Sequence, residues 1–196
     1  MTEPIQDDLL EARLDAAFEA TPRADYLPEK VRDRAGQDRP LPIPRNQTNS
    51  QPSTVRDMLW LLEVPEGAKV LDVGAGSGWT TALLAHLTGP EGSVLGVELE
   101  PELVEFGTGN LAKAERPWAE IRQATKGRVG APADGPFDRI LVSAQARKLP
   151  EELVKQLAPG GILVIPVASQ MWRVTLDENR KRSIDRLGAY LFVPLR

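Results

Sequence analysis

Residues 70–79, VLDVGAGSGW, decide how the rest of this chain is arranged. The stretch opens with an apolar run that predicts a buried strand, and three glycines at alternate positions follow, Gly74, Gly76 and Gly78. Residues 79–88 then favour a helix. A strand, a glycine turn and a helix begin a nucleotide-binding βαβ unit, because the turn is too tight for side chains and the free N–H groups of the helix point at the ligand. The stretch therefore predicts a nucleotide-binding α/β fold.

An acidic residue at the end of the next apolar run supports this prediction. Residues 93–98 read SVLGVE, and Glu98 lies 20 residues beyond Gly78. At that distance a carboxylate can accept hydrogen bonds from both hydroxyls of an adenosine ribose. The alternative is a surface acid at a strand end. The spacing favours ribose binding.

The glycine spacing distinguishes between nucleotides. Dinucleotide enzymes favour G-x-G-x-x-G, whereas this loop reads G-x-G-x-G, and no Gly-Lys-Ser/Thr follows as in a P-loop. The pattern resembles motif I of class I S-adenosylmethionine-dependent methyltransferases, in which the loop lies against the methionine part of the cofactor. A nicotinamide enzyme is therefore disfavoured. The resemblance implies that S-adenosyl-L-methionine is bound by Asp72, Gly74, Ala75, Gly76, Ser77 and Gly78.

Composition excludes several classes of protein. The 196 residues carry a net charge of −4 and no cysteine, which disfavours general nucleic-acid binding and excludes thiolate chemistry. The one histidine, His86, is expected to face the last carbonyls of the helix over 79–88, so we expect no catalytic triad and no metal site. The charged run 180–182 is expected to be a solvated hairpin tip. With no signal peptide and no long apolar run, the chain is expected to be a cytoplasmic protein, and a monomer.

We expect one domain over residues 1–196. Its first part, 1–62, contains a helix over 5–20, an irregular covering segment over 21–52 and a helix over 53–62. The core, 63–196, alternates strands and helices, which predicts a Rossmann-like, doubly wound, mostly parallel α/β sheet ending in an antiparallel strand pair. The strands are expected at 70–74, 94–98, 119–123, 139–142, 162–167, 172–176 and 187–195, and the helices at 79–88, 101–114 and 150–157. The ligand should bind between the first and fourth strands, where the strand order reverses.

Further motifs occur in a fixed order along residues 21–196. They are Thr21-Pro22-Arg23, Leu41-Pro42-Ile43, Gln47 to Pro52, residues 70–79, Pro136-Phe137-Asp138, Gln156 to Gly161, and Val193-Pro194-Leu195. Together they resemble the protein-L-isoaspartate O-methyltransferase family. The glycine motif is common to many methyltransferases, whereas Thr-x-Ser-Gln-Pro with Gln-Leu-x-Pro-Gly-Gly is much more specific.

The resemblance implies an activity and a set of site residues. Such enzymes transfer a methyl group from S-adenosylmethionine to the α-carboxyl of L-isoaspartyl residues in damaged proteins. Ser50 would lie near the transferred methyl, although it could instead cap the helix that starts near Ser53. The cofactor would also contact Gln47, Thr48, Leu99, Lys126 and Gly127. The substrate peptide would contact Leu41, Pro42, Ile43, Gln145 and Val193.

The implied chemistry agrees with the composition. A carboxylate with a pKa near ~4 is already ionised at neutral pH, so no base is needed to remove a proton. The protein has to place the carboxylate in line with the methyl group and exclude water from it. The covering segment 21–52 is suited to that role.

Three positions depart from the family pattern. Lys126 stands where the family carries an aspartate near the adenine amino group, and a lysine cannot accept a hydrogen bond. Asp134 or backbone carbonyls would have to replace that acceptor, or cofactor affinity would fall. Asn49 and Gln145 also differ from the family residues. These changes leave two alternatives: an enzyme acting on an aspartate of a dedicated peptide, or an inactive regulatory homologue.

Overall fold

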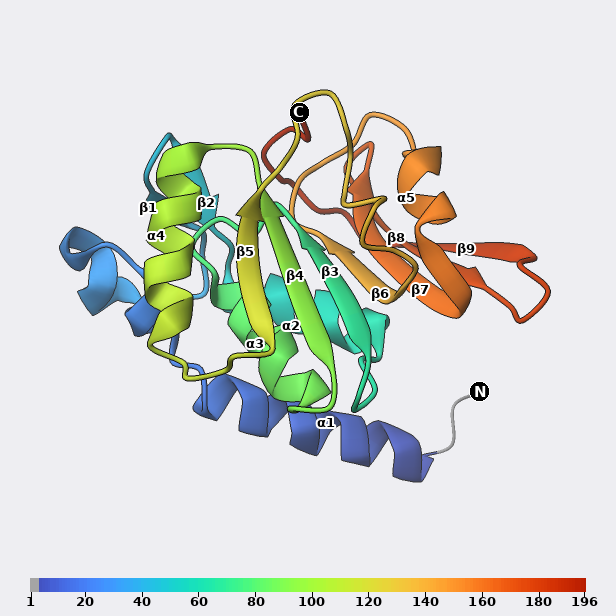
Figure 1. The fold of residues 1–196 in the computed structure, drawn as a ribbon. Coiled ribbons are helices and arrows are strands. Elements are labelled where there is room, and N and C mark those ends of the chain that lie inside the picture. Colours follow the sequence, from blue (N-terminus) through green and yellow to red (C-terminus); the bar gives the residue numbers. More distant parts are fainter. Residues whose placement is uncertain (1–3) are drawn as a thin grey trace.

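A seven-stranded sheet forms the centre of the structure, a computed structural model that describes residues 4–196 (Figure 1). The strand order is β5-β4-β3-β6-β7-β8-β9, and all neighbours are parallel except the last two pairs. The strands are β3 (Lys69–Val73), β4 (Ser93–Glu98), β5 (Ala119–Gln123), β6 (Phe137–Val142), β7 (Leu157–Val167), β8 (Gln170–Leu176) and β9 (Arg182–Leu187). The predicted Rossmann-like sheet with an antiparallel end is confirmed.

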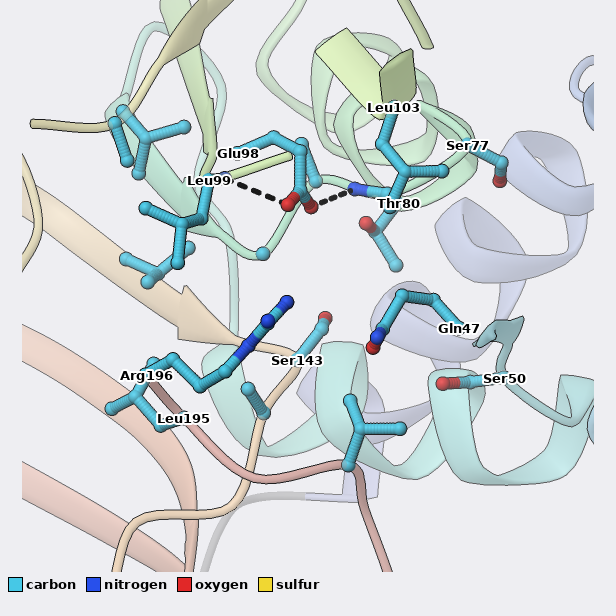
Figure 2. Close-up of a pocket in the computed structure, with 18 of the residues that line it drawn as sticks. Gln47, Ser50, Ser77, Thr80, Glu98, Leu99, Leu103, Ser143, Leu195 and Arg196 are labelled. Atoms are coloured by element: carbon cyan, nitrogen blue, oxygen red, sulfur yellow. Dashed lines mark hydrogen bonds between the residues drawn. The ribbon is translucent and has the colours of Figure 1, made fainter. Parts of the chain in front are cut away.

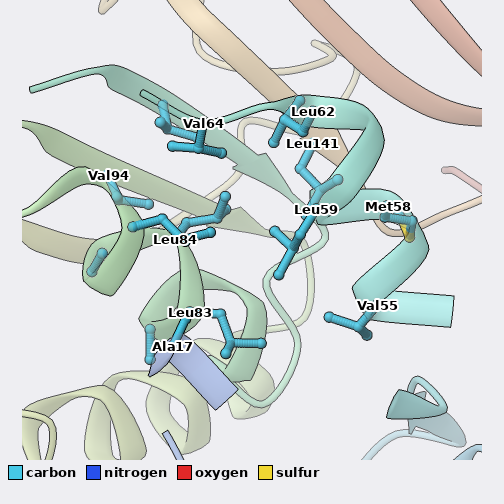
Figure 3. Packing of buried hydrophobic residues seen from close by; sticks show 14 of the residues in the cluster. Ala17, Val55, Met58, Leu59, Leu62, Val64, Leu83, Leu84, Val94 and Leu141 are labelled. Carbon is cyan, nitrogen blue, oxygen red and sulfur yellow. The ribbon is translucent and has the colours of Figure 1, made fainter. Parts of the chain in front are cut away.

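Helices cover both faces of this sheet. Three of them, α2 (Pro52–Leu62), α3 (Trp79–Thr88) and α4 (Pro101–Ala112), lie on one face, and α1 (Pro4–Glu19) packs across α2 and α3. The short helix α5 (Glu151–Lys155) covers the other face. Successive strand residues point to opposite faces, and so neighbouring apolar residues of one strand enter different clusters. Figure 3 shows the larger cluster, where Leu59 of α2 and Leu84 of α3 meet Leu141 of β6.

The order of the strands creates a crevice at one point. The strand β3 lies between β4 and β6, and the chain leaves β3 toward one side and reaches the other side only later. At such a reversal, the connections after the two central strands run in opposite directions and leave a gap at the carboxyl ends. The reversal lies between the first and fourth core strands, as the sequence predicts.

The covering segment is more regular than expected. It contains two 3₁₀ helices, η1 (Arg23–Tyr26) and η2 (Glu29–Arg34), and a small hairpin of β1 (Leu41–Ile43) and β2 (Gln47–Asn49). Among residues 4–196, no helix is both long and apolar enough to cross a membrane.

The end of the chain differs from the prediction. The last strand is β9, which ends at Leu187, so the strand expected over 187–195 does not form beyond its first residue. Gly188, with a φ of +51°, turns the chain out of the sheet. Beyond it, the N–H of Gln145 donates to the carbonyl of Val193 at 2.7 Å, and the N–H of Leu195 donates to the carbonyl of Gln145 at 2.8 Å. The apolar tail 188–196 therefore folds back toward the crevice.

Helix α4 approaches the glycine loop unusually closely. A Cβ atom at Gly107 would lie 2.7 Å from the carbonyl oxygen of Gly76, and a Cβ atom at Gly78 would lie 2.7 Å from the carbonyl oxygen of Gly107. Because backbone atoms cannot move aside as a flexible side chain can, any side chain at either position would push α4 away from the loop.

Two glycines of α4 should therefore respond in opposite ways to alanine. A Cβ atom at Gly109 meets nothing within 4 Å. Gly109→Ala should stabilise the protein by about 0.5–1 kcal/mol, because alanine favours a helix. Gly107→Ala should destabilise it by about 1–3 kcal/mol, because the helix must shift. Urea unfolding followed by circular dichroism measures both values, and stabilisation of the Gly107 variant would contradict the close approach.

Candidate active site

A pocket that is open at its mouth lies at the carboxyl ends of β3, β4 and β6 (Figure 2). Its walls come from the glycine loop, the strand ends, the β1–β2 hairpin, the loop after β5, the starts of α3 and α4, and the C-terminal tail. The predicted residues from the loop and β4 that line it are Gly74, Ala75, Gly76, Ser77, Glu98 and Leu99. Those from the covering segment and the tail are Ile43, Gln47, Thr48, Ser50 and Val193.

Seven predicted site residues do not line this pocket. They are Leu41, Pro42, Asp72, Gly78, Lys126, Gly127 and Gln145. Leu41 is buried in a small cluster with Leu27 and Val31, and Pro42 faces solvent on the other side of β1. Gly78 packs against α4. Gln145 contributes its backbone, which holds the tail, rather than a side chain in the pocket.

The loop after β5 reaches the pocket with other residues than expected. Thr125, Arg128, Val129 and Gly130 line it, whereas Lys126 and Gly127 do not. The side chain of Asp134, a possible replacement acceptor, forms an ion pair with Arg122 at 2.8 Å and lies outside the lining. The lysine that departs from the family pattern therefore does not enter the pocket, and neither does the proposed acidic replacement.

Glu98 fixes the glycine loop against the end of β4. One carboxylate oxygen accepts a hydrogen bond from the N–H of Gly76 at 3.0 Å, and the other accepts one from the N–H of Leu99 at 2.7 Å (Figure 2). The second oxygen also accepts from the N–H of Glu100 at 3.0 Å. The three loop glycines have φ values of +84°, +51° and +84°, a conformation that favours glycine. The carboxylate thus stands beside a bare backbone, and its remaining lone pairs are available to a ligand hydroxyl.

Asp72, at the end of β3 before the loop, forms its hydrogen bonds with residues of α3. One of its oxygens accepts the hydroxyls of Thr80 at 2.8 Å and Thr81 at 2.7 Å, while the other has no hydrogen-bond partner among the described residues. Burial raises the pKa of Asp72 to about 6; the two threonine hydroxyls oppose this rise and the charge of Glu98 adds to it. Asp72, predicted to bind the cofactor, has a fully buried side chain and lies outside the pocket lining.

The covering segment is organised by a buried arginine of the Thr21-Pro22-Arg23 motif, a residue to which the sequence assigned no role. Arg23 is 6% exposed, and its guanidinium donates to the side-chain oxygen of Asn49 at 2.6 Å. It also donates to five backbone carbonyls, those of Ala35, Gln37, Arg39, Asn49 and Ser50. Burial lowers the pKa of Arg23 to about 10, partly offset by Asp38, so the group stays charged at neutral pH. The Arg23 side chain therefore holds residues 35–50 of the covering segment together through hydrogen bonds.

Ser50 is free for a role in the pocket. Helix α2 has Gln51 at its N-cap position, so Ser50 does not cap it, and Ser53 bonds to Asp38 instead. In the described part of the chain, the Ser50 hydroxyl makes no hydrogen bond, while its carbonyl accepts from Arg23 at 2.8 Å. The alternative that Ser50 is a helix cap is wrong.

The pocket contains no histidine and, within residues 4–196, no cluster of three acidic or histidine side chains that could hold a metal. The Nδ1 of His86, a residue expected to face its helix carbonyls, lies 3.3 Å from the Nη2 of Arg116, and burial together with Arg116 and Arg13 lowers the pKa of His86. Sequence reasoning also missed Ser143, Thr80 and Trp79 in the lining. Ser143 follows β6 directly, so its place at a strand end was predictable, whereas the position of the tail was not.

Comparison with known proteins gives consistent results. A model of the family described as protein-L-isoaspartate(D-aspartate) O-methyltransferase matches residues 5–196. Protein-L-isoaspartate O-methyltransferases of Methanopyrus kandleri and Aeropyrum pernix are 43% and 46% identical; the alignments cover 93% and 91% of this chain and 83% and 70% of those relatives. A crystal structure of such a methyltransferase homologue from Plasmodium falciparum, in complex with S-adenosyl-L-homocysteine, is 26% identical with a TM-score of 0.83 and covers 97% of this chain and 98% of its own.

The raised pKa of Asp72 predicts a pH-dependent stability. Its folded-state pKa of about 6 lies above that of an unfolded aspartate, so the folded protein holds the extra proton between these pH values. Stability from this group is therefore lost as the pH rises through about 4 to 6. The Asp72→Asn variant cannot titrate at this position and should not lose this stability. Its free energy of unfolding relative to that of the unmodified protein should therefore rise by about 3 kcal/mol between about pH 3.5 and 7. Urea unfolding at stepped pH measures this difference, with the exposed Asp33→Asn as the control variant. A difference that does not change with pH would contradict the assignment.

Proposed function

This chain belongs to the protein-L-isoaspartate(D-aspartate) O-methyltransferase family, and we propose that it transfers a methyl group from S-adenosyl-L-methionine to the α-carboxyl of L-isoaspartyl residues in damaged proteins. The observation that carries the proposal is the pocket itself. It joins a bare glycine loop and the Glu98 carboxylate on one wall to Ser50 and the covering segment on another. The related Plasmodium falciparum structure contains S-adenosyl-L-homocysteine, the product form of this cofactor.

The residues of the pocket fit S-adenosylmethionine. A Cβ atom at Gly76 would lie 3.4 Å from Ile43 and would narrow the gap between the loop and the hairpin, so glycine keeps that gap open. Glu98 is held by three N–H groups and offers its remaining lone pairs to the two ribose hydroxyls. Leu99, Val129 and Thr125 form a partly apolar wall for the adenine ring. The cofactor supplies an electrophilic methyl group on a sulfonium.

The protein's own contribution is positioning. The acceptor carboxylate is ionised at neutral pH, so a pocket without a histidine base lacks nothing that the reaction requires. The Ser50 hydroxyl is free to donate to one oxygen of that carboxylate and to hold the other toward the methyl group. The covering segment, gathered by Arg23, keeps water from the reacting oxygen.

Substrate peptide is proposed to enter between the hairpin and the tail. Ile43 and Val193 line the pocket from these two segments, and the carbonyl of Val193 is already held by the N–H of Gln145. Lys126 motivated the alternative of an inactive homologue. This side chain lies outside the lining and therefore does not obstruct the pocket; with Asp134 outside as well, a backbone carbonyl would have to accept a hydrogen bond from the adenine amino group.

A direct assay tests the proposed function. The protein is incubated with S-adenosylmethionine labelled on the methyl group and with an isoaspartyl peptide, and the matched peptide with normal aspartate serves as the control substrate. A base-labile methyl ester should form on the isoaspartyl peptide alone. Ser50→Ala should lower kcat by about tenfold to hundredfold and leave cofactor affinity unchanged, because the hydroxyl acts on the carboxylate. No ester with the isoaspartyl peptide would overturn the proposal.

The role of Glu98 has its own test. Glu98→Gln turns one acceptor oxygen into an N–H₂ donor facing backbone N–H groups, so at least one of the three hydrogen bonds is lost. The affinity for S-adenosylhomocysteine, measured by calorimetry, should fall at least about tenfold, which corresponds to about 1.4 kcal/mol. The exposed Glu102→Gln, four residues away, is the control and should bind as the unmodified protein does. Equal affinities for both variants would refute the ribose contact.

A further inference from the structure

A chain of three buried polar side chains links the covering segment to the glycine loop. Arg23 donates from Nε to the Oδ1 of Asn49 at 2.6 Å, and the Nδ2 of Asn49 donates to the Oγ of Ser77 at 2.9 Å. The three residues are 6%, 5% and 3% exposed. Water is therefore largely excluded from these hydrogen bonds, and each group depends on its protein partner.

The chemistry of these side chains fixes the direction of every hydrogen bond. An arginine has only donors, so the atom of Asn49 that faces Arg23 must be the amide oxygen. The amide nitrogen then faces Ser77, and it can only donate. The Oγ of Ser77 is thus an acceptor on this side, and its own proton must point elsewhere. Among residues 4–196, the Ser77 hydroxyl donates no hydrogen bond.

Ser77 is placed where a ligand would meet that proton. It lines the pocket and comes just before α3, whose first N–H groups add positive potential near an anion. The neighbouring hydroxyls of Thr80 and Thr81 donate to Asp72 and are not available to a ligand. Figure 2 shows Ser77, Gln47 and Ser50 along the same side of the pocket. Ser77 is therefore the hydroxyl that the loop leaves for a ligand acceptor.

We propose that Arg23 and Asn49 are positioning residues that hold the Ser77 hydroxyl as a one-way donor to the carboxylate of the cofactor's methionine part. This inference rests on the proposed function for the identity of the cofactor. The carboxylate is the anionic acceptor of that ligand, whereas its amino group and sulfonium are cationic and its ribose hydroxyls face Glu98. Arg23 also donates to the carbonyl of Ser50 at 2.8 Å. One guanidinium therefore positions both Ser77, through Asn49, and Ser50, the residue proposed to contact the acceptor carboxylate.

A nearly isosteric substitution at Asn49 reverses the direction of its hydrogen bond with Ser77 without removing the contact. In Asn49→Asp the carboxylate still accepts from Arg23, now as an ion pair, so the fold should be retained. It also presents an acceptor to Ser77, whose hydroxyl must then turn away from the pocket and donate to it. The dissociation constant of S-adenosylhomocysteine, measured by calorimetry, should rise about tenfold to hundredfold. The affinity for 5′-methylthioadenosine, which lacks the carboxylate, should stay within about twofold of the unmodified protein.

A double-substitution cycle separates this role from a merely structural one. Ser77→Ala removes the donor, so Asn49→Asp should cause no further loss in the Ser77→Ala background. The matched control is Asn110→Asp. Asn110 is another buried asparagine on Ser77, but its amide donates to the backbone carbonyl at 3.1 Å. Its effect should add to that of Ser77→Ala.

The outcomes are distinct. The proposal is supported if Asn49→Asp weakens binding of S-adenosylhomocysteine but not of 5′-methylthioadenosine, and if this weakening does not occur in the Ser77→Ala background. Unchanged affinity in Asn49→Asp, or equal weakening of both ligands, overturns it while leaving the proposed function intact. If the unmodified protein binds no S-adenosylhomocysteine, the proposed cofactor is wrong, and so is the assignment of its carboxylate as the acceptor for Ser77. Urea unfolding midpoints of all variants confirm that folded proteins are compared.

Discussion

The pocket depends first on the hydrogen bonds that the Glu98 carboxylate accepts from three backbone N–H groups. They join the glycine loop after β3 to the end of β4 and to the start of α4. Helix α4 then packs so closely on the loop that only glycine fits at Gly78 and Gly107. A fixed negative charge thus stands beside a backbone without side chains. This arrangement suits a ligand that offers hydroxyls to the acid and a flat or charged group to the loop.

A second buried charge organises the opposite wall. Arg23 accepts no hydrogen bond, so each of its hydrogen-bond partners must be an acceptor, and the chain supplies five carbonyls and one amide oxygen. These carbonyls belong to residues 35–50, whose regular structure is limited to the short β1–β2 hairpin. Their unpaired oxygens would be costly to bury without a donor. One guanidinium therefore allows a proline-rich segment to cover a pocket as a defined wall.

The two walls meet through polar side chains with fixed directions. Donors run from Arg23 through Asn49 to Ser77, while the threonine hydroxyls of α3 are occupied by Asp72. Buried networks of this kind leave few choices for where the last proton can point. The reaction proposed for this family member needs no base, and positioning of this kind is what the protein can contribute to it.

The sequence by itself determined the strand, glycine turn and helix of residues 70–88, the acid 20 residues later and the mostly parallel sheet. These features are local or follow simple periodicity, so short stretches suffice to read them. It failed for residues 187–195, read as a strand, and the family motifs placed Lys126 and Asp72 against the cofactor, whereas both lie outside the pocket lining. Only the tertiary structure decided these, and it alone brought Asn49 to Ser77, 28 residues away. The physical reason is that the orientation of a side chain toward a distant partner depends on how the covering segment and tail fold over the sheet, and no local pattern encodes that geometry.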